Sequence, residues 1–267
     1  MKRGIVSLIL VVAAAAPAFA ELQKRDIKPM YGLLGPQRKS LDVFPGDEIF
    51  FTFFVAGAAV DEKGNVNVTT TVEAFDPDGK QVLNQTGATK GALALGGGGY
   101  PGVAQVNFGT GVPIGDYKVT VTVHDLTKDA STSFDRKVSI KPPDFTFIKL
   151  HFSYDDKGAT PAPVGGVVSQ RLFYSLKVLG FDKSQKKIKV VMKVQVLDEK
   201  DREMMPEPLT VTVASENENE VAGATDLSFN ANISLNRPGA FTLRITLTDE
   251  IAKKSVSQET PLKVSAP

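Results

Sequence analysis

The sequence contains no cysteine and no tryptophan, and only two of its 267 residues are histidines. The lack of cysteine excludes disulfides, thiol nucleophiles and cysteine-ligated metal sites. Neither sign of charge is in excess, since 31 Lys and Arg residues face 30 Asp and Glu residues. This balance argues against nucleic acid or an anionic membrane surface as partner, because both attract basic proteins. The fold must therefore depend on a packed apolar core, for which 16 Phe residues and many Val, Ile and Leu residues are present.

The only long apolar run lies at the N-terminal end. Lys2 and Arg3 precede an apolar stretch over residues 4–16, and Ala18-Phe19-Ala20 follows it. A basic start, an apolar middle and a small-x-small end are typical of a signal peptide, and a membrane anchor needs ~20 consecutive apolar residues. No cysteine is available for a lipid anchor. We therefore predict a cleavable signal peptide over residues 1–20 and an exported, soluble chain without a membrane anchor, either periplasmic or extracellular.

Two segments of the chain repeat each other. Residues 113–140 (PIGDYKVTVTVHDLTKDASTSFDRKVSI) align without a gap with residues 237–264 (RPGAFTLRITLTDEIAKKSVSQETPLKV), and weaker matches continue upstream of both. A duplication of this length predicts two self-sufficient folding units. We place them at residues 21–142 and 143–267, separated by the short stiff linker Pro142-Pro143.

Apolar and polar residues alternate in both copies. Tyr117, Val119, Val121 and Val123 alternate with polar residues, and the equivalent stretch around Ile245 does the same. A period of two indicates strands with one buried and one solvated face, as in antiparallel sheets. The predicted strands of the first unit are 39–44, 48–57, 66–76, 80–85, 103–108, 116–125 and 131–140. Those of the second unit are 146–154, 169–179, 187–198, 209–214, 226–234, 240–249 and 254–264. The sequence therefore predicts an all-β protein of two tandem immunoglobulin-like antiparallel β-sandwich domains.

A family resemblance rests on a strand that begins with Gly-x-Tyr, here Gly115-Asp116-Tyr117, and leads into a polar hairpin. The chain resembles bacterial immunoglobulin-like and fibronectin-III-like modules along most of its length. More narrowly, GPQRKSLDVFPGDEIFF (35–51), ATPAPVGGVV (159–168) and RPGAFTLRITLTD (237–249) are similar to exported tandem-domain proteins of planctomycete-type bacteria. The resemblance implies a fold and an exported location but no activity. Tyr117 matches the tyrosine-corner position of immunoglobulin domains, whereas Phe241 has no hydroxyl for such a corner.

Neither histidine predicts catalysis. His124 adjoins Asp125 on the solvated face of its strand, and Ser131 lies across the predicted hairpin, but no Gly-x-Ser-x-Gly elbow accompanies them. His151 alternates with buried residues and is expected to be solvated as well. We therefore expect the chain not to be an enzyme and to use no cofactor.

Two acidic segments could suggest a metal site. Asp76-Pro77-Asp78-Gly79 lies between two apolar runs, where a turn is favoured over a calcium loop because the residues that follow provide no further carboxylates. The second unit places Glu199, Lys200 and Asp201 at the same turn, which would not preserve a set of metal ligands. The stretch 215–220 (SENENE) is predicted to be a solvated loop. We therefore predict no metal site.

The most unusual local composition is a glycine run followed by a tyrosine. Gly96, Gly97, Gly98, Gly99 and Tyr100 do not form a phosphate-binding loop, because no Lys-Ser/Thr pair or helix follows. A flexible connection between strands is the favoured interpretation. The alternative is a recognition loop with Tyr100 at its tip, because binding residues concentrate on loops held by a rigid scaffold.

These observations favour a non-catalytic exported module that interacts with a protein or polymer of the cell envelope, or has a structural role there. One alternative is a periplasmic chaperone, although the two units resemble each other and no basic cleft can be located. The other is a glycan-binding module, which the absence of tryptophan disfavours.

Overall fold

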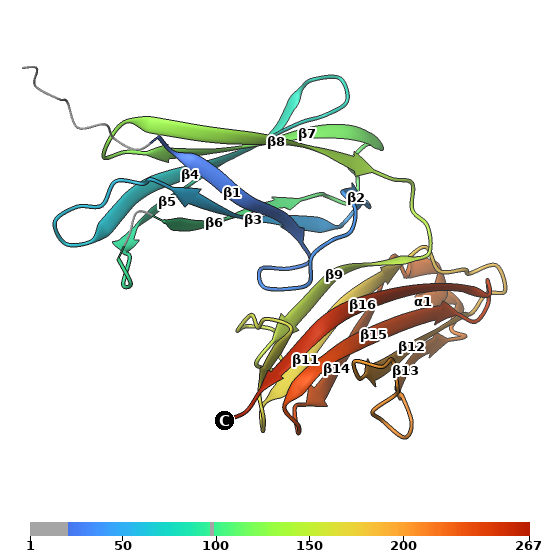
Figure 1. Ribbon diagram of the computed structural model, residues 1–267. Helices are drawn as coiled ribbons and strands as arrows, with labels where there is room; N and C mark the ends of the chain where they lie inside the picture. Colours follow the sequence, from blue (N-terminus) through green and yellow to red (C-terminus); the bar gives the residue numbers. More distant parts are fainter. Residues whose placement is uncertain (1–20, 97–98) are drawn as a thin grey trace, which may run out of the picture.

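The computed structural model describes residues 21–96 and 99–267 and contains two β-sandwiches that follow one another along the chain (Figure 1). Each sandwich packs a three-stranded sheet against a five-stranded sheet. No sheet combines strands from both sandwiches in this part of the chain. The predicted signal peptide, residues 1–20, lies outside the described residues.

The first sandwich contains strands β1 to β8. Its small sheet has the order β1-β3-β6 and its large sheet has the order β2-β8-β7-β4-β5. The strands are β1 Gln23–Met30, β2 Asp42–Val43, β3 Glu48–Ala56, β4 Asn65–Phe75, β5 Gln81–Ala92, β6 Tyr100–Asn107, β7 Gly115–Asp125 and β8 Ala130–Ile140.

The second sandwich repeats this arrangement with strands β9 to β16. Its sheets have the orders β9-β11-β14 and β10-β16-β15-β12-β13. The elements are β9 Thr146–Ser153, β10 Gly165–Val167, β11 Arg171–Leu179, β12 Ile188–Leu197, β13 Leu209–Ser215, α1 Glu218–Gly223, β14 Leu227–Ser234, β15 Gly239–Asp249 and β16 Lys254–Ser265.

The prediction of an all-β, immunoglobulin-like fold is confirmed. All the pairings are antiparallel except β2 with β8 and β10 with β16, which are short and parallel. The alternation also gave the correct faces: Val121 and Ile245 are buried, at 0% and 3% exposure, whereas Thr122 and Thr246 are only half-buried. Each sandwich thus has an apolar core of its own between its two sheets.

Three elements were missed. β1 and β10 were not predicted. Residues 215–220, predicted as a solvated loop, are exposed from Glu216 onwards but include the start of α1 at Glu218, which was missed. Asn217 caps α1 by accepting hydrogen bonds from the backbone N–H groups of Asn219 and Glu220, at 3.0 and 3.3 Å. Val221 of this helix is buried in the core of the second sandwich, and this packing holds the short helix in place.

The acidic turn has the same geometry in both sandwiches. Asp76 Oδ1 accepts hydrogen bonds from the N–H groups of Asp78 and Lys80, at 3.0 and 2.9 Å. In the second sandwich Asp198 Oδ1 accepts from Lys200 and Arg202, at 2.8 and 3.0 Å. The first aspartate thus caps a hairpin turn in each copy, as the sequence predicted.

Candidate functional site

The glycine run lies between β5 and β6, and Gly97 and Gly98 fall outside the described residues. Tyr100 is the first residue of β6, paired with Val55, and only 9% of its surface is exposed. Its hydroxyl contacts Thr89 Oγ1 at 3.1 Å. Because its ring is packed inside the sandwich, Tyr100 cannot lie at the tip of a recognition loop. The interpretation that placed it there is wrong for this side chain. Gly99 has a packing role, because a Cβ at this position would lie 2.1 Å from Phe54 Cζ.

His124 contacts both a hydroxyl and a carboxylate. Its Nδ1 lies 2.7 Å from Ser131 Oγ, and its Nε2 lies 3.4 Å from Asp129 Oδ1. A catalytic triad orients its histidine with a buried carboxylate, whereas the Asp129 side chain is 96% exposed. The second sandwich carries Thr248 and Ser255 at the matching positions, with a hydroxyl contact of 2.9 Å. We therefore interpret the contact of His124 with Ser131 as an ordinary cross-strand pair.

Asp125 and Asp249 end equivalent strands and are completely buried. Asp125 Oδ2 accepts a hydrogen bond from Ala59 N at 2.6 Å, and Asp249 Oδ2 accepts one from Asp182 N at 2.7 Å. Both also cap the hairpin that follows, through Thr127 N and Ile251 N. Since both copies carry the aspartate in the same role, it anchors loops. In residues 21–96 and 99–267, no group of three or more His, Cys, Asp or Glu side chains could hold a metal ion.

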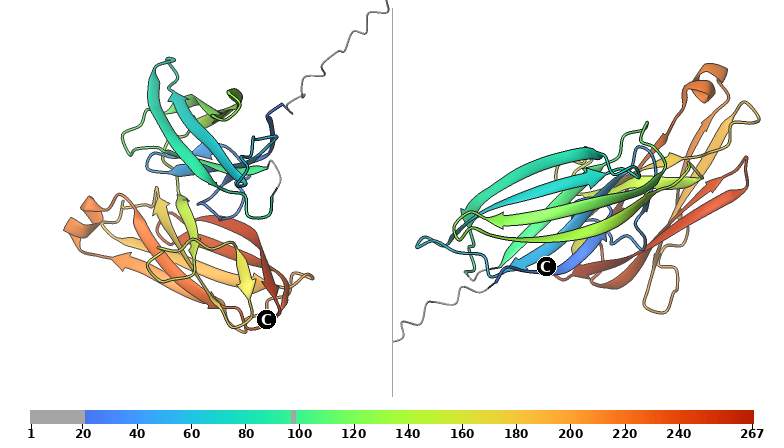
Figure 2. Two further views of the ribbon diagram at one scale, coloured as in Figure 1. Left: turned by 90° about the vertical axis from the view of Figure 1, so that its left-hand side faces the viewer. Right: turned by 90° about the horizontal axis from the view of Figure 1, so that it is seen from above.

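His151 lies at the contact between the two sandwiches. Its Nε2 contacts Glu48 Oε1, and its side chain is 43% exposed while that of Glu48 is 8% exposed. Burial raises the pKa of Glu48, but the hydrogen bond and charge of His151, with help from Gln105 and Lys149, leave this pKa below its usual value. The prediction of a solvated histidine was therefore incomplete, because β9 lies against the β1–β2 loop and the start of β3 (Figures 1 and 2).

A buried ion pair supports the same contact. Arg38 Nη2 lies 2.8 Å from both carboxylate oxygens of Asp47, and both side chains are at most 3% exposed. Burial raises the pKa of Asp47, and the opposing effect of the Arg38 charge does not cancel it. The Arg38 guanidinium lies 4.0 Å from the ring centroid of Tyr31, which in turn packs on Phe147 of β9.

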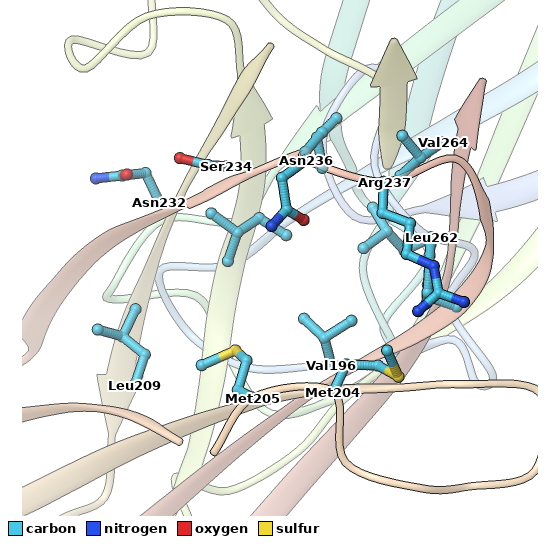
Figure 3. A pocket seen from close by; sticks show the side chains of 13 residues that line it. Val196, Met204, Met205, Leu209, Asn232, Ser234, Asn236, Arg237, Leu262 and Val264 are labelled. Atoms are coloured by element: carbon cyan, nitrogen blue, oxygen red, sulfur yellow. The ribbon is translucent and has the colours of Figure 1, made fainter. Parts of the chain in front are cut away.

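The second sandwich has an apolar cavity of about 520 Å³ at one end. Figure 3 shows Asn236 and Arg237 on one side of it and Met204 and Met205 on the opposite side. Both sheets contribute to its wall, together with the β12–β13 and β14–β15 loops. The cavity is lined by Val196, Met204, Met205, Leu209, Asn232, Ile233, Ser234, Leu235, Asn236, Arg237, Phe241, Leu262 and Val264.

Only one of these 13 lining residues, Arg237, is charged. Its side chain is exposed and forms no hydrogen bond or ion pair with any residue that the structure describes. Met204 is 36% exposed, so apolar and flexible surface is present at the mouth of the cavity. The arrangement fits an apolar group that carries or adjoins a negative charge.

The first sandwich fills the same place with two rings. Tyr117, equivalent to Phe241, is 1% exposed, and its ring packs edge-on against Phe108 at 6.1 Å. Tyr117 also donates a hydrogen bond to Pro113 O, at 3.0 Å, which is the predicted tyrosine corner. In the second sandwich the smaller Leu235 replaces Phe108.

Phe241 does not fill the space left by this difference. Its ring lies against Gly239, where a Cβ would be 3.0 Å from Phe241 Cζ, and it remains partly exposed. The mismatch between Tyr117 and Phe241 was the one sequence signal for this cavity. The rest of the wall, including the adjacent Met204 and Met205, was not predicted to be functional.

Comparisons with known proteins give no family. No family model matches the chain, and no curated protein matches it in sequence. Among solved structures it is similar to red sea bream transglutaminase (TM-score 0.28, 11% identity) and to dimeric latent PorU from Porphyromonas gingivalis (TM-score 0.37, 11% identity). Each match covers 94% of this chain but only 32% and 21% of those proteins. Likeness at this level supports neither an activity nor a site. No helix in residues 21–96 and 99–267 is long and apolar enough to cross a membrane.

Proposed function

We propose that this chain is a non-catalytic binding protein whose recognition site is the apolar cavity of the second sandwich. Its partner would be a protein or polymer of the cell envelope. The observation that carries the proposal is the difference between the copies: two packed rings close the first sandwich where the second is open and lined by apolar side chains. Binding sites are commonly concave and mainly apolar, with a few polar groups that orient the ligand.

Three further features support the proposal. The Met pair beside the cavity offers an adaptable apolar surface, and Arg237 offers a cation without a partner among the described residues. The contact of His124 with Ser131 is replaced in the second sandwich by a contact between two hydroxyl groups, as expected if it is structural and not catalytic.

Filling the cavity tests the proposal. Leu235→Phe restores the larger ring of the first sandwich, and we expect it to abolish capture of a partner by crosslinking from envelope extracts. The matched control is Leu126→Trp, which adds a ring at a residue that is 47% exposed in the first sandwich. The cavity would be excluded as the recognition site if the Leu235→Phe variant unfolds at the wild-type temperature and still captures the partner as well as the wild type and the control do.

Export is the second part of the proposal. We expect cleavage between Ala20 and Glu21, because Ala18 and Ala20 are small residues of the kind signal peptidase accepts. The intact mass of the chain recovered from the producing cells checks this expectation. Recovery in the membrane fraction with Met1 still attached would contradict it.

A further inference from the structure

The cavity lies beside the free edge of β14. This strand is at one end of the sheet order β14-β11-β9, so one of its edges has no partner strand among the described residues. Leu235, just after β14, donates its N–H to Gln170 O at 2.9 Å, on the β11 side. Because the backbone groups of successive strand residues point to opposite edges, those of Ser234 and Asn232 point away from β11. Both residues also line the cavity.

An added strand at this edge would place its side chains in the cavity. Successive side chains of a strand point to opposite faces, so every second residue of the added strand would face the core side, as Ile233 does in β14. Ile233 is buried and lines the cavity, whereas its neighbours Asn232 and Ser234 are exposed. The volume of about 520 Å³ provides room for more than one large apolar side chain.

The charge of the cavity selects among such strands. Arg237 is its single charged residue and follows β14 by three positions. A segment paired with the end of β14 would therefore carry an acidic residue to match it. β13 is also an edge strand and lines the cavity through Leu209. β14 is the better candidate, because it lines the cavity with Asn232, Ile233 and Ser234 and the chain then continues directly to Arg237.

On the basis of the proposed function, we infer that the occupant is an extended peptide segment that pairs with β14. It places apolar side chains at alternate positions into the cavity and an acidic side chain near Arg237. Its backbone N–H and C=O groups bond those of Asn232 and Ser234, and the side chains provide selectivity. A free fatty acid could fill the cavity too, but it has no backbone to pair with the strand edge.

Selection from random linear peptides displayed on phage tests the inference without a known partner. With the signal-free chain as bait, we expect enriched peptides to combine apolar residues at every second position with Asp or Glu towards one end. Arg237→Glu should lose these peptides and select peptides with Lys or Arg at that position instead. Enrichment without alternation, or the same peptides on Leu235→Phe, would overturn the inference.

Hydrogen exchange with an enriched peptide reads the strand pairing directly. We expect slower exchange at the amides of Asn230, Asn232 and Ser234, and little change at Phe229 and Ile233, which already face β11. The corresponding edge of the first sandwich, at Gln105 and Asn107 of β6, should not change. The inference would be overturned if no peptide is enriched, or if a bound peptide slows exchange equally along all of β14. It would also be overturned if the chain binds laurate but no peptide. The proposed function would still be supported after any of these results if the wild type captures a partner from envelope extracts and Leu235→Phe does not.

Discussion

The two sandwiches share one topology but differ at the same end. In the first sandwich this end carries Asp47 and Glu48, and β9 of the second sandwich covers it. The equivalent positions in the second sandwich are Gln170 and Arg171, both exposed, and the apolar cavity lies beside them. Two sandwiches of the same topology thus differ at this end, which makes the contact between them in the first sandwich and is open in the second.

The difference also shows in what each end contains. The first sandwich buries charges and packs Phe108 on Tyr117. In the second sandwich the Phe241 ring lies against Gly239, and Arg237 has no partner among the described residues. The strands that hold these residues are nearly identical in register. Function in this protein would therefore come from a few side chains at one end, because the cores are alike.

The largest effect is expected from charges placed in the two cores. Val121→Asp and Ile245→Asp each bury an unpaired carboxylate, which costs several kcal/mol, comparable with the ~5–15 kcal/mol stability of a whole domain. Thermal unfolding of each variant measures the loss. If the sandwiches are separate folding units, each variant should abolish only one of two unfolding transitions. Complete unfolding of the whole chain by either substitution would contradict the predicted boundary at residues 142 and 143.

Most of the fold was predictable because alternation alone defines the faces of long strands such as β7 and β15. The missed elements lack that signal. β10 has only three residues and pairs through its backbone, and β1 is interrupted where Asp26 takes a positive φ of 53°. In α1 a capping asparagine precedes a helix of only six residues, too short for an apolar period.

The candidate site was much less predictable. The contact between Glu48 and His151 joins residues that are 103 positions apart, and no local pattern indicates such a contact. The cavity depends on which way the Phe241 ring turns, which the sequence does not specify. The sequence showed only that Phe241 lacks the hydroxyl group that Tyr117 has at the equivalent position.

A second prediction concerns the buried ion pair that distinguishes the covered end. Asp47→Ala leaves the Arg38 guanidinium buried without its carboxylate and should cost about 3–5 kcal/mol. Gln170→Ala, at the matching exposed position, removes one hydrogen bond to Val167 N and should cost about 1 kcal/mol or less. Chemical denaturation compares the two. The double variant Arg38→Met, Asp47→Leu should recover most of the loss, and equal costs for the two single variants would contradict a special role for the covered end.

The third prediction compares two buried tyrosines. Tyr117→Phe removes the hydroxyl that bonds Pro113 O and should cost about 1 kcal/mol. The Tyr174 hydroxyl is buried without a hydrogen-bond partner among the described residues, and its burial raises its pKa. Tyr174→Phe should therefore be neutral or stabilising, because it removes an unpaired polar group from the core. Equal destabilisation by both changes in thermal unfolding would show that Tyr174 has a partner.

The smallest effect is expected on the solvated faces. Thr122 faces Thr71 and Ser133 on the neighbouring strands, whereas Thr246 faces Lys193 and Ser257. Thr122→Lys should change stability by less than about 0.5 kcal/mol, as for ordinary surface residues. Thr246→Lys places two ammonium groups directly opposite each other and should cost a few tenths of a kcal/mol more. This excess should vanish in about 1 M salt, where charges are screened beyond ~3 Å, and Thr246→Gln should lack it at any salt concentration. If the extra loss of stability persists in high salt, its cause is the lost hydroxyl contact between Thr246 and Ser257, at 3.0 Å. Thr246→Gln would then show the same loss.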